Sequence, residues 1–337
     1  MKKTWQERTL ELYSYGHTLK YITAIIEDEY NCNHMYDKVR GHIRRHGNEV
    51  ELERESAIVS CEPAVDDRKD IPAQTEKRVA IQNQEPKHHT TKWDGTRELK
   101  FAIMGDTQFG SKYAQITYLN DFYDLCEKQG IHDVYHTGDI TDGLKMRVGH
   151  EYELYVTSAD DMLDDVIKNY PKREGITTHF ITGNHDASIY KQVGYDIGRA
   201  IENARSDMEY LGRDCAVVNL TPNCTLELRH PWDGTAYALS YKIQKMIEAM
   251  ESDSKPNILA VGHYHKAEYI FYRNIHALQT GSFQAQTPFT RGKGISVNIG
   301  GWLVSIRVDE EGHIQGFAPE FVPFYFSIKD DYKNFNR

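Results

Sequence analysis

Short apolar runs alternate with longer amphipathic stretches over the last two thirds of the chain. Runs rich in β-branched and aromatic residues predict strands at 99–104, 134–137, 179–182, 225–229 and 257–261. Between these runs, apolar residues recur at three- and four-residue spacing. That spacing predicts helices over 118–128, 159–169, 197–204 and 241–249. Alternation of this kind is typical of an α/β domain, and consecutive strand-like runs beyond residue 269 predict an antiparallel end to its sheet.

The first fifty residues carry a different pattern, which predicts three short helices. The first spans Trp5 to Tyr13, and Thr18 and Asn33 are the expected N-caps of the other two. In the third helix, apolar side chains recur at helical spacing at Tyr36, Val39 and Ile43.

Basic side chains gather on this third predicted helix. They are Lys38, Arg40, Arg44 and Arg45. A compact helix pair with a basic final helix resembles a helix-turn-helix unit, whose last helix enters the DNA major groove. The alternative is a small helical bundle that serves oligomerisation or caps the second domain, and the sequence leaves both open.

The chain is expected to have three parts. Residues 1–50 form the helical, helix-turn-helix-like domain, and residues 94–337 form the large α/β domain. Residues 51–93 are mixed in charge and poor in aromatic side chains, which indicates a polar flexible linker. His88 and His89 lie in that linker and are expected to be solvated.

Composition narrows the class of protein. The formal net charge of -10 argues against a generally basic protein that coats nucleic acid, so any nucleic-acid contact must be local. No run of eighteen apolar residues occurs, and the polar start lacks the apolar stretch of a secretory signal. Five scattered cysteines are typical of reduced thiols. We therefore expect a cytoplasmic protein without a membrane partner.

Each predicted strand is followed by a polar cluster. In chain order these are Gly105-Asp106-Thr107-Gln108, Gly138-Asp139-Ile140-Thr141-Asp142-Gly143, Gly183-Asn184-His185-Asp186, Arg229-His230-Pro231 and Gly262-His263-Tyr264-His265. In layered α/β folds the carboxyl ends of the strands line one crevice, so all five clusters are expected to converge. Glycine before a polar residue lets the backbone turn sharply and approach closely.

The residue types in these clusters suit a pair of divalent cations. Carboxylate and amide oxygens and imidazole nitrogens bind borderline and hard metals, whereas structural zinc sites prefer cysteine. Two metals roughly 3.5–4 Å apart need a bridging carboxylate, and Asp139 is the expected bridge.

The ordered set Asp-x-Gln, Gly-Asp-x-x-Asp-Gly, Gly-Asn-His-Asp, a lone His and Gly-His-x-His resembles the signature of the calcineurin-like metallophosphoesterases. The resemblance covers about Leu99 to the end of the chain. Each motif alone is weak, but all five in order are specific. The resemblance implies an α/β fold, a four-layer α/β/β/α sandwich in which two mixed sheets are flanked by helices, with the small all-α N-terminal domain outside it. It also implies a two-metal phosphoesterase.

Carried over by position, the resemblance assigns a role to each residue. One metal is implied at Asp106, Gln108, Asp139 and His265, and the other at Asp139, Asn184, His230 and His263. His185 is implied as the proton donor to the leaving group, with Asp186 orienting its ring, while Asp142 supports the Asp139 turn. Gln108 departs from the commoner histidine, and its harder amide oxygen favours Mn²⁺, with Fe²⁺, Zn²⁺ or Mg²⁺ left open.

Two loops are candidates for substrate contact. The segment between the second and third clusters offers His150, Glu151 and Tyr152. The late loop around residues 282–294 offers Arg291 and Lys293 as phosphate contacts. The alternative for the late loop is an ordinary hairpin with exposed charges.

Three functions follow from these patterns. The first is a phosphodiesterase acting on DNA, a nuclease of repair, recombination or phage type, and the basic helix favours it. The second is an enzyme on small nucleotides or other phosphoesters, whose N-terminal domain serves assembly, for example into a homo-oligomer. The third is a non-enzymatic DNA-binding regulator, which the filled ligand positions disfavour.

Overall fold

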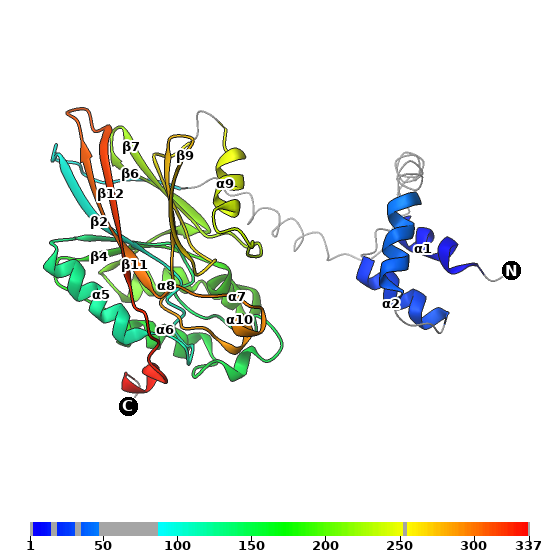
Figure 1. Cartoon of the computed structure of the whole chain (residues 1–337). Helices are drawn as coiled ribbons and strands as arrows, with labels where there is room; N and C mark the ends of the chain where they lie inside the picture. The colour runs from blue at the N-terminus through cyan, green and yellow to red at the C-terminus, as the bar shows by residue number, and fades with distance from the viewer. Residues whose placement is uncertain (1–2, 15–18, 31–34, 47–86, 252–254, 336–337) are drawn as a thin grey trace, which may run out of the picture. The chain divides into compact units, whose positions relative to one another are not determined.

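The computed structural model describes residues 3–14, 19–30, 35–46, 87–251 and 255–335. The chain divides into two compact units, Met1–Asn83 and Gln84–Arg337 (Figure 1). Within these described ranges, every helix is too short or too polar to cross a membrane.

The N-terminal unit contains α1 (Trp5–Ser14), α2 (Leu19–Glu29) and a further helix over 36–46. Thr4 and Glu7 form a capping box at the start of α1, because each side chain accepts a hydrogen bond from the other's backbone N–H. The three helices share a small apolar core that is made by Leu12, Ile22, Ile26, Met35 and Val39. The expected caps Thr18 and Asn33 lie outside the described residues.

The second unit is built on two six-stranded sheets. The first sheet has the order β1-β6-β7-β8-β10-β9, with β1 (Lys87–Thr90), β6 (Cys215–Thr221), β7 (Cys224–Arg229), β8 (Ile258–Val261), β10 (Ile275–Thr280) and β9 (Ala267–Tyr272). The second has the order β12-β11-β2-β3-β4-β5, with β12 (Ile314–Pro323), β11 (Gly300–Val308), β2 (Glu98–Met104), β3 (Asp133–His136), β4 (Thr177–Thr182) and β5 (Met208–Arg213). Both sheets are mixed. In the first, β7 pairs parallel with β8 and antiparallel with β6, and in the second, β2 pairs parallel with β3 and antiparallel with β11.

Successive residues of a strand point to opposite faces, and this alternation separates the layers. In β2, Phe101 and Ile103 pack in the core between the sheets, whereas Ala102 and Met104 pack under the outer helices. Those helices are α5 (Ile116–Lys128), α6 (Ala159–Asn169), α7 (Asn184–Val193) and α8 (Ile197–Ala204). α9 (Tyr241–Glu248) packs on the opposite sheet (Figure 1). The predicted α/β/β/α sandwich is confirmed.

The predicted strands and helices all occur, with ends shifted by at most two residues, and α6 and α8 have the predicted bounds. Several elements went unpredicted, including α7, β5, β6 and the short α10 (Pro288–Gly292). β1 lies inside the expected linker, where it pairs parallel with β6 at the edge of a sheet. Its side chains are mostly exposed, so backbone hydrogen bonds hold it and no apolar pattern marks it.

Candidate metal centre

The five polar clusters directly follow β2, β3, β4, β7 and β8, and the third of them runs into the first turn of α7. Asp106, Gln108, Asp139, His263 and His265 adopt positive φ, between 52° and 76°. This conformation costs a non-glycine residue about 1 kcal/mol or more, and it concentrates at functional sites. Gly183 permits the close approach expected of it, because a Cβ there would collide with the Asp139 carboxylate and the His230 ring.

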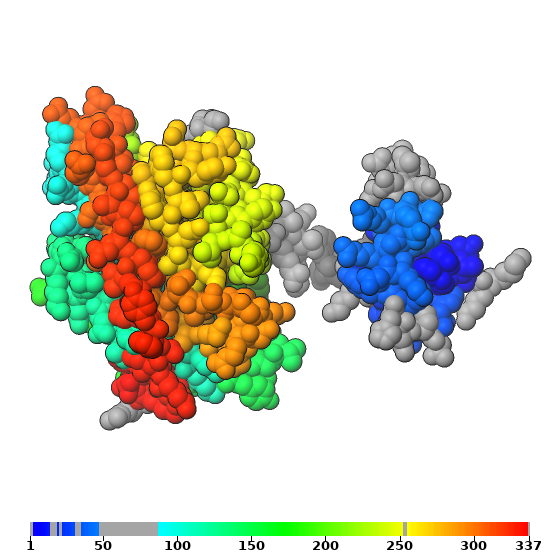
Figure 2. Space-filling model, viewed as in Figure 1, coloured from blue at the N-terminus to red at the C-terminus, as the bar shows by residue number. Residues whose placement is uncertain are grey.

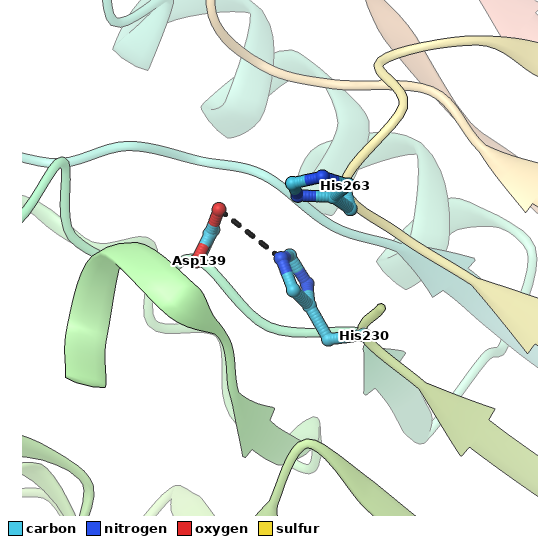
Figure 3. Close-up of side chains that lie close together, drawn as sticks. All are labelled: Asp139, His230 and His263. Carbon is cyan, nitrogen blue, oxygen red and sulfur yellow. Dashed lines mark ion pairs between the residues drawn. The ribbon is translucent and has the colours of Figure 1, made fainter. Parts of the chain in front are cut away.

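Asp139, His230 and His263 converge from three different loops, and their ligand atoms lie within 4.8 Å of one another (Figure 3). His230 Nε2 lies 3.2 Å from Asp139 Oδ2 and 3.0 Å from Asn184 Oδ1. Three groups with lone pairs thus face one point. Such a gathering of acceptors is what a cation requires.

Backbone carbonyls fix which ring nitrogen faces this point. His230 Nδ1 donates to the carbonyl of Thr137 at 2.7 Å, which leaves Nε2 as the free acceptor in the neutral ring. His263 Nε2 donates to the carbonyl of Asp233 at 2.6 Å, which leaves Nδ1. Histidines that bind metal are commonly oriented by such a bond from the other nitrogen.

The other half of the predicted set adjoins this cluster. His265 Nε2 lies 3.3 Å from Asp106 Oδ1, and Gln108 Nε2 donates to Asp139 Oδ2 at 3.2 Å. Within the described part of the chain, Gln108 Oε1 and His265 Nδ1 are buried without a hydrogen-bond partner. A buried acceptor without a partner costs about 1–3 kcal/mol, so the free Gln108 oxygen fits a bound cation. The residues present therefore fit a divalent metal.

Protons and cations compete for this cluster. Burial alone would raise the pKa of Asp139, but the charges of His230 and His185 outweigh it and hold that pKa below its usual range. Burial opposes charge on His230 as well, yet the adjacent Asp139 carboxylate raises the pKa of His230 to about 9. Burial and the charge of His230 lower the pKa of His263 to about 4. Metal binding at such a site releases protons and weakens as pH falls.

His185 lies in the first turn of α7, and its ring lines the cavity over the centre. Its Nδ1 donates to the backbone carbonyl of Asp142 at 2.7 Å and lies 3.0 Å from Asp142 Oδ1. Burial alone would lower the pKa of His185, but the Asp139 and Asp142 carboxylates raise it to about 10. Nε2 is left to act on a ligand in the cavity.

The structure corrects the role expected for Asp186. Its carboxylate accepts hydrogen bonds from the backbone N–H groups of Ile140, Thr141 and Gly183, and the ring of His185 is held by Asp142 instead. Asp186 is the third residue of α7, so its side chain turns back to the start of its own helix. Burial and the Asp139 charge raise the pKa of Asp186 to about 6.

A cavity of about 520 Å³ opens above these side chains. Its lining includes Asp139, Asn184, His185, His263 and His265 from the predicted site. Such a volume lies within the usual range of small-molecule sites.

Of the five candidate substrate contacts, Lys293 alone is among the described residues that line the cavity. Arg291 lies in α10 on the same loop, but neither it nor the exposed Tyr152 is among the residues that line the cavity. His150 is completely buried, with Nε2 3.4 Å from Asp142 Oδ1, so it lies too deep to touch a substrate. The burial of His150 disfavours it as a substrate contact, whereas contact by Glu151, Tyr152 or Arg291 stays a prediction, because loop sequence does not reveal which side chains turn inward.

Arg147 and Phe289 line the cavity but were missed from the sequence. The Arg147 guanidinium lies 4.2 Å from the centroid of the Phe289 ring and pairs with Glu153. This contact joins the loop after β3 to the loop that carries α10. No motif marked either residue, since the pairing depends on how two distant loops meet.

The expected DNA contacts lie on the helix over 36–46. Lys38, Arg40, Arg44 and Arg45 are exposed, while Val39 on the same helix is fully buried. Their binding to DNA stays a prediction.

Comparisons with known proteins agree with this architecture. The calcineurin-like phosphoesterase family matches residues 99–267, half of the chain. The DNA polymerase II small subunit of Methanothermobacter thermautotrophicus is 25% identical over 191 residues, which cover 46% of this chain and 39% of that subunit. The chain thus spans about two fifths of the length of this curated relative.

Two solved structures are also similar. An archaeal phosphodiesterase has 10% identity and a TM-score of 0.38, and the match covers 66% of this chain and 100% of that chain. The zinc complex of wild-type Vps29 from Entamoeba histolytica has 17% identity and a TM-score of 0.32, and the match covers 67% and 99%. Because the family match contains every strand-end cluster of the site, the chain belongs to the calcineurin-like phosphoesterases and is a metal-dependent hydrolase of phosphoester bonds.

Proposed function

We propose that this chain hydrolyses phosphodiester bonds in DNA with two divalent metal ions, most favourably Mn²⁺. The observation that carries the two-metal proposal is the position of Asp139. Its Oδ2 lies 3.2 Å from both His230 Nε2 and Gln108 Nε2, so one carboxylate adjoins both halves of the donor set. A bridging carboxylate must occupy such a place.

Under this proposal each half of the set holds one ion. The first set is Asp106, Gln108, Asp139 and His265, and the second is Asp139, Asn184, His230 and His263. Two cations roughly 3.5–4 Å apart polarise a phosphoryl group and lower the pKa of water. The amide oxygen of Gln108 favours a harder ion such as Mn²⁺.

His185 gives its proton to the leaving oxygen. Its Nδ1 is engaged by the backbone carbonyl and carboxylate of Asp142, so the Nε2–H is the one available in the cavity. A proton donor positioned in this way contributes about 10²–10⁴-fold to rate. Asp142 therefore positions His185, and Asp186 holds the turn that carries Asp139.

The choice of DNA rests on the N-terminal unit. Residues 1–50 act as a DNA-binding domain joined by a linker, and the exposed cations of the helix over 36–46 contact phosphates. The likeness to a DNA polymerase small subunit supports a role close to DNA.

The alternative substrate is a small phosphoester, which a cavity of about 520 Å³ suits. Arg147 and Phe289 come from two different loops and contact each other in the cavity lining. In this case the N-terminal unit serves assembly, for example of a homo-oligomer.

A substrate panel separates the two. The full chain with Mn²⁺ is assayed on single-stranded DNA, duplex DNA, RNA, cyclic nucleotides and bis(p-nitrophenyl) phosphate. We expect DNA to be cleaved with the highest kcat/KM. In the double variant Arg44→Gln/Arg45→Gln, DNA affinity should fall and its salt dependence should become shallower by about two units.

The matched control is Lys128→Gln/Lys168→Gln, which removes two exposed charges from the catalytic unit. Cyclic nucleotides as the best substrate, with equal DNA affinity in both double variants, would contradict the DNA proposal and favour the small-ester alternative.

A further inference from the structure

The segment that follows His230 keeps large aromatic side chains in solvent. Trp232 is 39% exposed and Tyr237 is fully exposed. Gly234 and Thr235, which lie between them, line the metal cavity. Exposed aromatic side chains gathered beside a site commonly mark a binding surface.

Basic side chains lie over aromatic rings on the same side of the centre. Lys191 Nζ lies 4.0 Å from the centroid of the Trp232 ring, and the Arg213 guanidinium lies 4.5 Å from that of Tyr190. Both distances fall within the range of cation–π contact. We call Tyr190, Lys191, Arg213, Trp232 and Tyr237 the aromatic flank.

Hydrogen bonds and an ion pair hold Trp232 and Arg213 of the aromatic flank next to the metal centre. Trp232 Nε1 donates to Asp214 Oδ1 at 2.8 Å, and Arg213 pairs with Asp196 at 2.8 Å. The backbone N–H of His230 donates to the carbonyl of Asp214 at 2.7 Å, so the anchor of Trp232 is also bonded to an expected ligand. Tyr190 and Lys191 belong to α7, the helix that begins with Asn184 and His185.

A similar contact lies elsewhere on the cavity rim. The Arg147 guanidinium lies over the ring of Phe289, and Lys293 lies on the same loop as Phe289. The cavity is lined both by Phe289 and by Asp233, the neighbour of Trp232, so it connects the two groups. In Figure 2 the orange segment around α10 and the yellow segment around α9 lie on one visible face of the catalytic unit.

We propose that the aromatic flank binds a single-stranded nucleic acid next to the bond being cleaved, a proposal that rests on the phosphodiesterase function above. Trp232 and Tyr237 stack on bases, while Lys191 and Arg213 attract the adjoining phosphates. Stacking on aromatic rings beside basic residues is the common mode of single-strand binding. Bases in a duplex are stacked on one another, so their faces do not reach such rings.

Charge supports this occupant. The chain carries a formal net charge of -10, so a polyanion is repelled by most of the surface and needs a local cationic surface near the metals. Lys191 supplies a cation beside the Trp232 ring, whereas the charge of Arg213 is partly offset by its ion pair with Asp196, and the rings suit planar bases. The basic helix over 36–46 lies in the N-terminal unit and is a separate feature. Substitution of its arginines tests the proposed DNA-binding domain and not the aromatic flank.

The test measures binding of the full chain to fluorescein-labelled oligo(dT) by anisotropy, with EDTA to prevent cleavage. Trp232→Ala and Tyr237→Ala should each weaken binding about 5- to 150-fold, as expected for the loss of one stacked base. Trp232→Phe should recover much of the loss, because it keeps a ring. Tyr325→Ala, which removes an exposed ring that is absent from the cavity lining, is the matched control.

Hydrolysis with Mn²⁺ separates this proposal from the one beneath it. For Trp232→Ala, kcat/KM on oligo(dT) should fall at least about fivefold more than on bis(p-nitrophenyl) phosphate, because the lost stacking weakens binding of the oligonucleotide alone. Equal oligo(dT) affinity in wild type, Trp232→Ala and Tyr237→Ala would contradict the proposal that the aromatic flank binds single strands. A loss of duplex binding as large as the loss of oligo(dT) binding would contradict it as well. If neither substrate is hydrolysed by the wild type, the phosphodiesterase proposal fails. The anisotropy result still decides whether the aromatic flank binds single-stranded nucleic acid.

Discussion

Replacing Asp186 by asparagine distinguishes a structural role from a catalytic one. The Asp186 carboxylate is buried, and its Oδ2 accepts from the N–H groups of Ile140 at 3.1 Å and Gly183 at 3.0 Å. Its Oδ1 accepts from the N–H and hydroxyl of Thr141 at 2.8 and 2.7 Å. These bonds tie the turn after Asp139 to the start of α7.

The magnitude follows from these contacts. Asparagine keeps the shape of Asp186 but turns one acceptor oxygen into an NH₂ group. In the better orientation this NH₂ faces Thr141, whose hydroxyl can turn to accept from it, so the Thr141 backbone N–H alone loses its acceptor. One buried donor left without an acceptor predicts a loss of about 1–3 kcal/mol in the free energy of unfolding. Typical domains are stable by about 5–15 kcal/mol, so the effect is large.

Urea unfolding of the full chain in EDTA, followed by tryptophan fluorescence, measures this loss. Asp160→Asn, at an exposed position in the first turn of α6, is the control and should cost less than about 1 kcal/mol. If Asp186→Asn abolished ester hydrolysis but left the urea midpoint and metal affinity unchanged, Asp186 would act on His185 as the sequence suggested and our interpretation would be wrong.

Three further outcomes are expected. His185→Ala should strongly slow the hydrolysis of alkyl or nucleotide diesters and slow that of nitrophenyl esters less, because a good leaving group needs no proton. Equal losses of rate on both kinds of ester in steady-state assays would exclude proton donation by His185. Burial alone would lower the pKa of His179, but carboxylates at 2.7 and 2.8 Å raise it above 6.5. The protonated form of His179 therefore adds stability below about pH 6.5, and this stability is lost as pH rises through the raised pKa. In urea titrations, His179→Gln should be less stable than wild type at low pH and should match it at alkaline pH. A Cβ at Gly143, where φ is +68°, would collide with the His185 carbonyl, so Gly143→Ala should destabilise by about 2–5 kcal/mol in thermal unfolding. Gly149→Ala is the control and should cost about 1–2 kcal/mol, because φ is +81° there but a Cβ would make only an ordinary contact with Tyr152 at 3.8 Å.

The elements that could be predicted from the sequence are those with a strong apolar pattern and local caps. α6 and α8 have their predicted bounds because each combines a continuous apolar face with an N-cap side chain, Ser158 or Asp196, that accepts from the third residue of the helix. The five strand-end clusters also converge as expected, because the carboxyl ends of parallel strands meet at one edge of the sheets.

Features that depend on tertiary contact could not be read from the sequence. β1 has no apolar alternation, since it is an edge strand held by its pairing with β6. The exchange of roles between Asp142 and Asp186 depends on how α7 begins, and α7 itself was not predicted. Arg147 faces the cavity because its loop meets the loop of Phe289, which is distant in sequence.

The most direct test of the two-metal centre is a calorimetric titration of the full, metal-stripped chain with Mn²⁺. We predict two ions per chain in wild type, the loss or marked weakening of both in Asp139→Asn, and the loss of one in Gln108→Ala. Hydrolysis of bis(p-nitrophenyl) phosphate should fall in parallel. Two ions retained by Asp139→Asn, with full hydrolytic activity, would contradict the account.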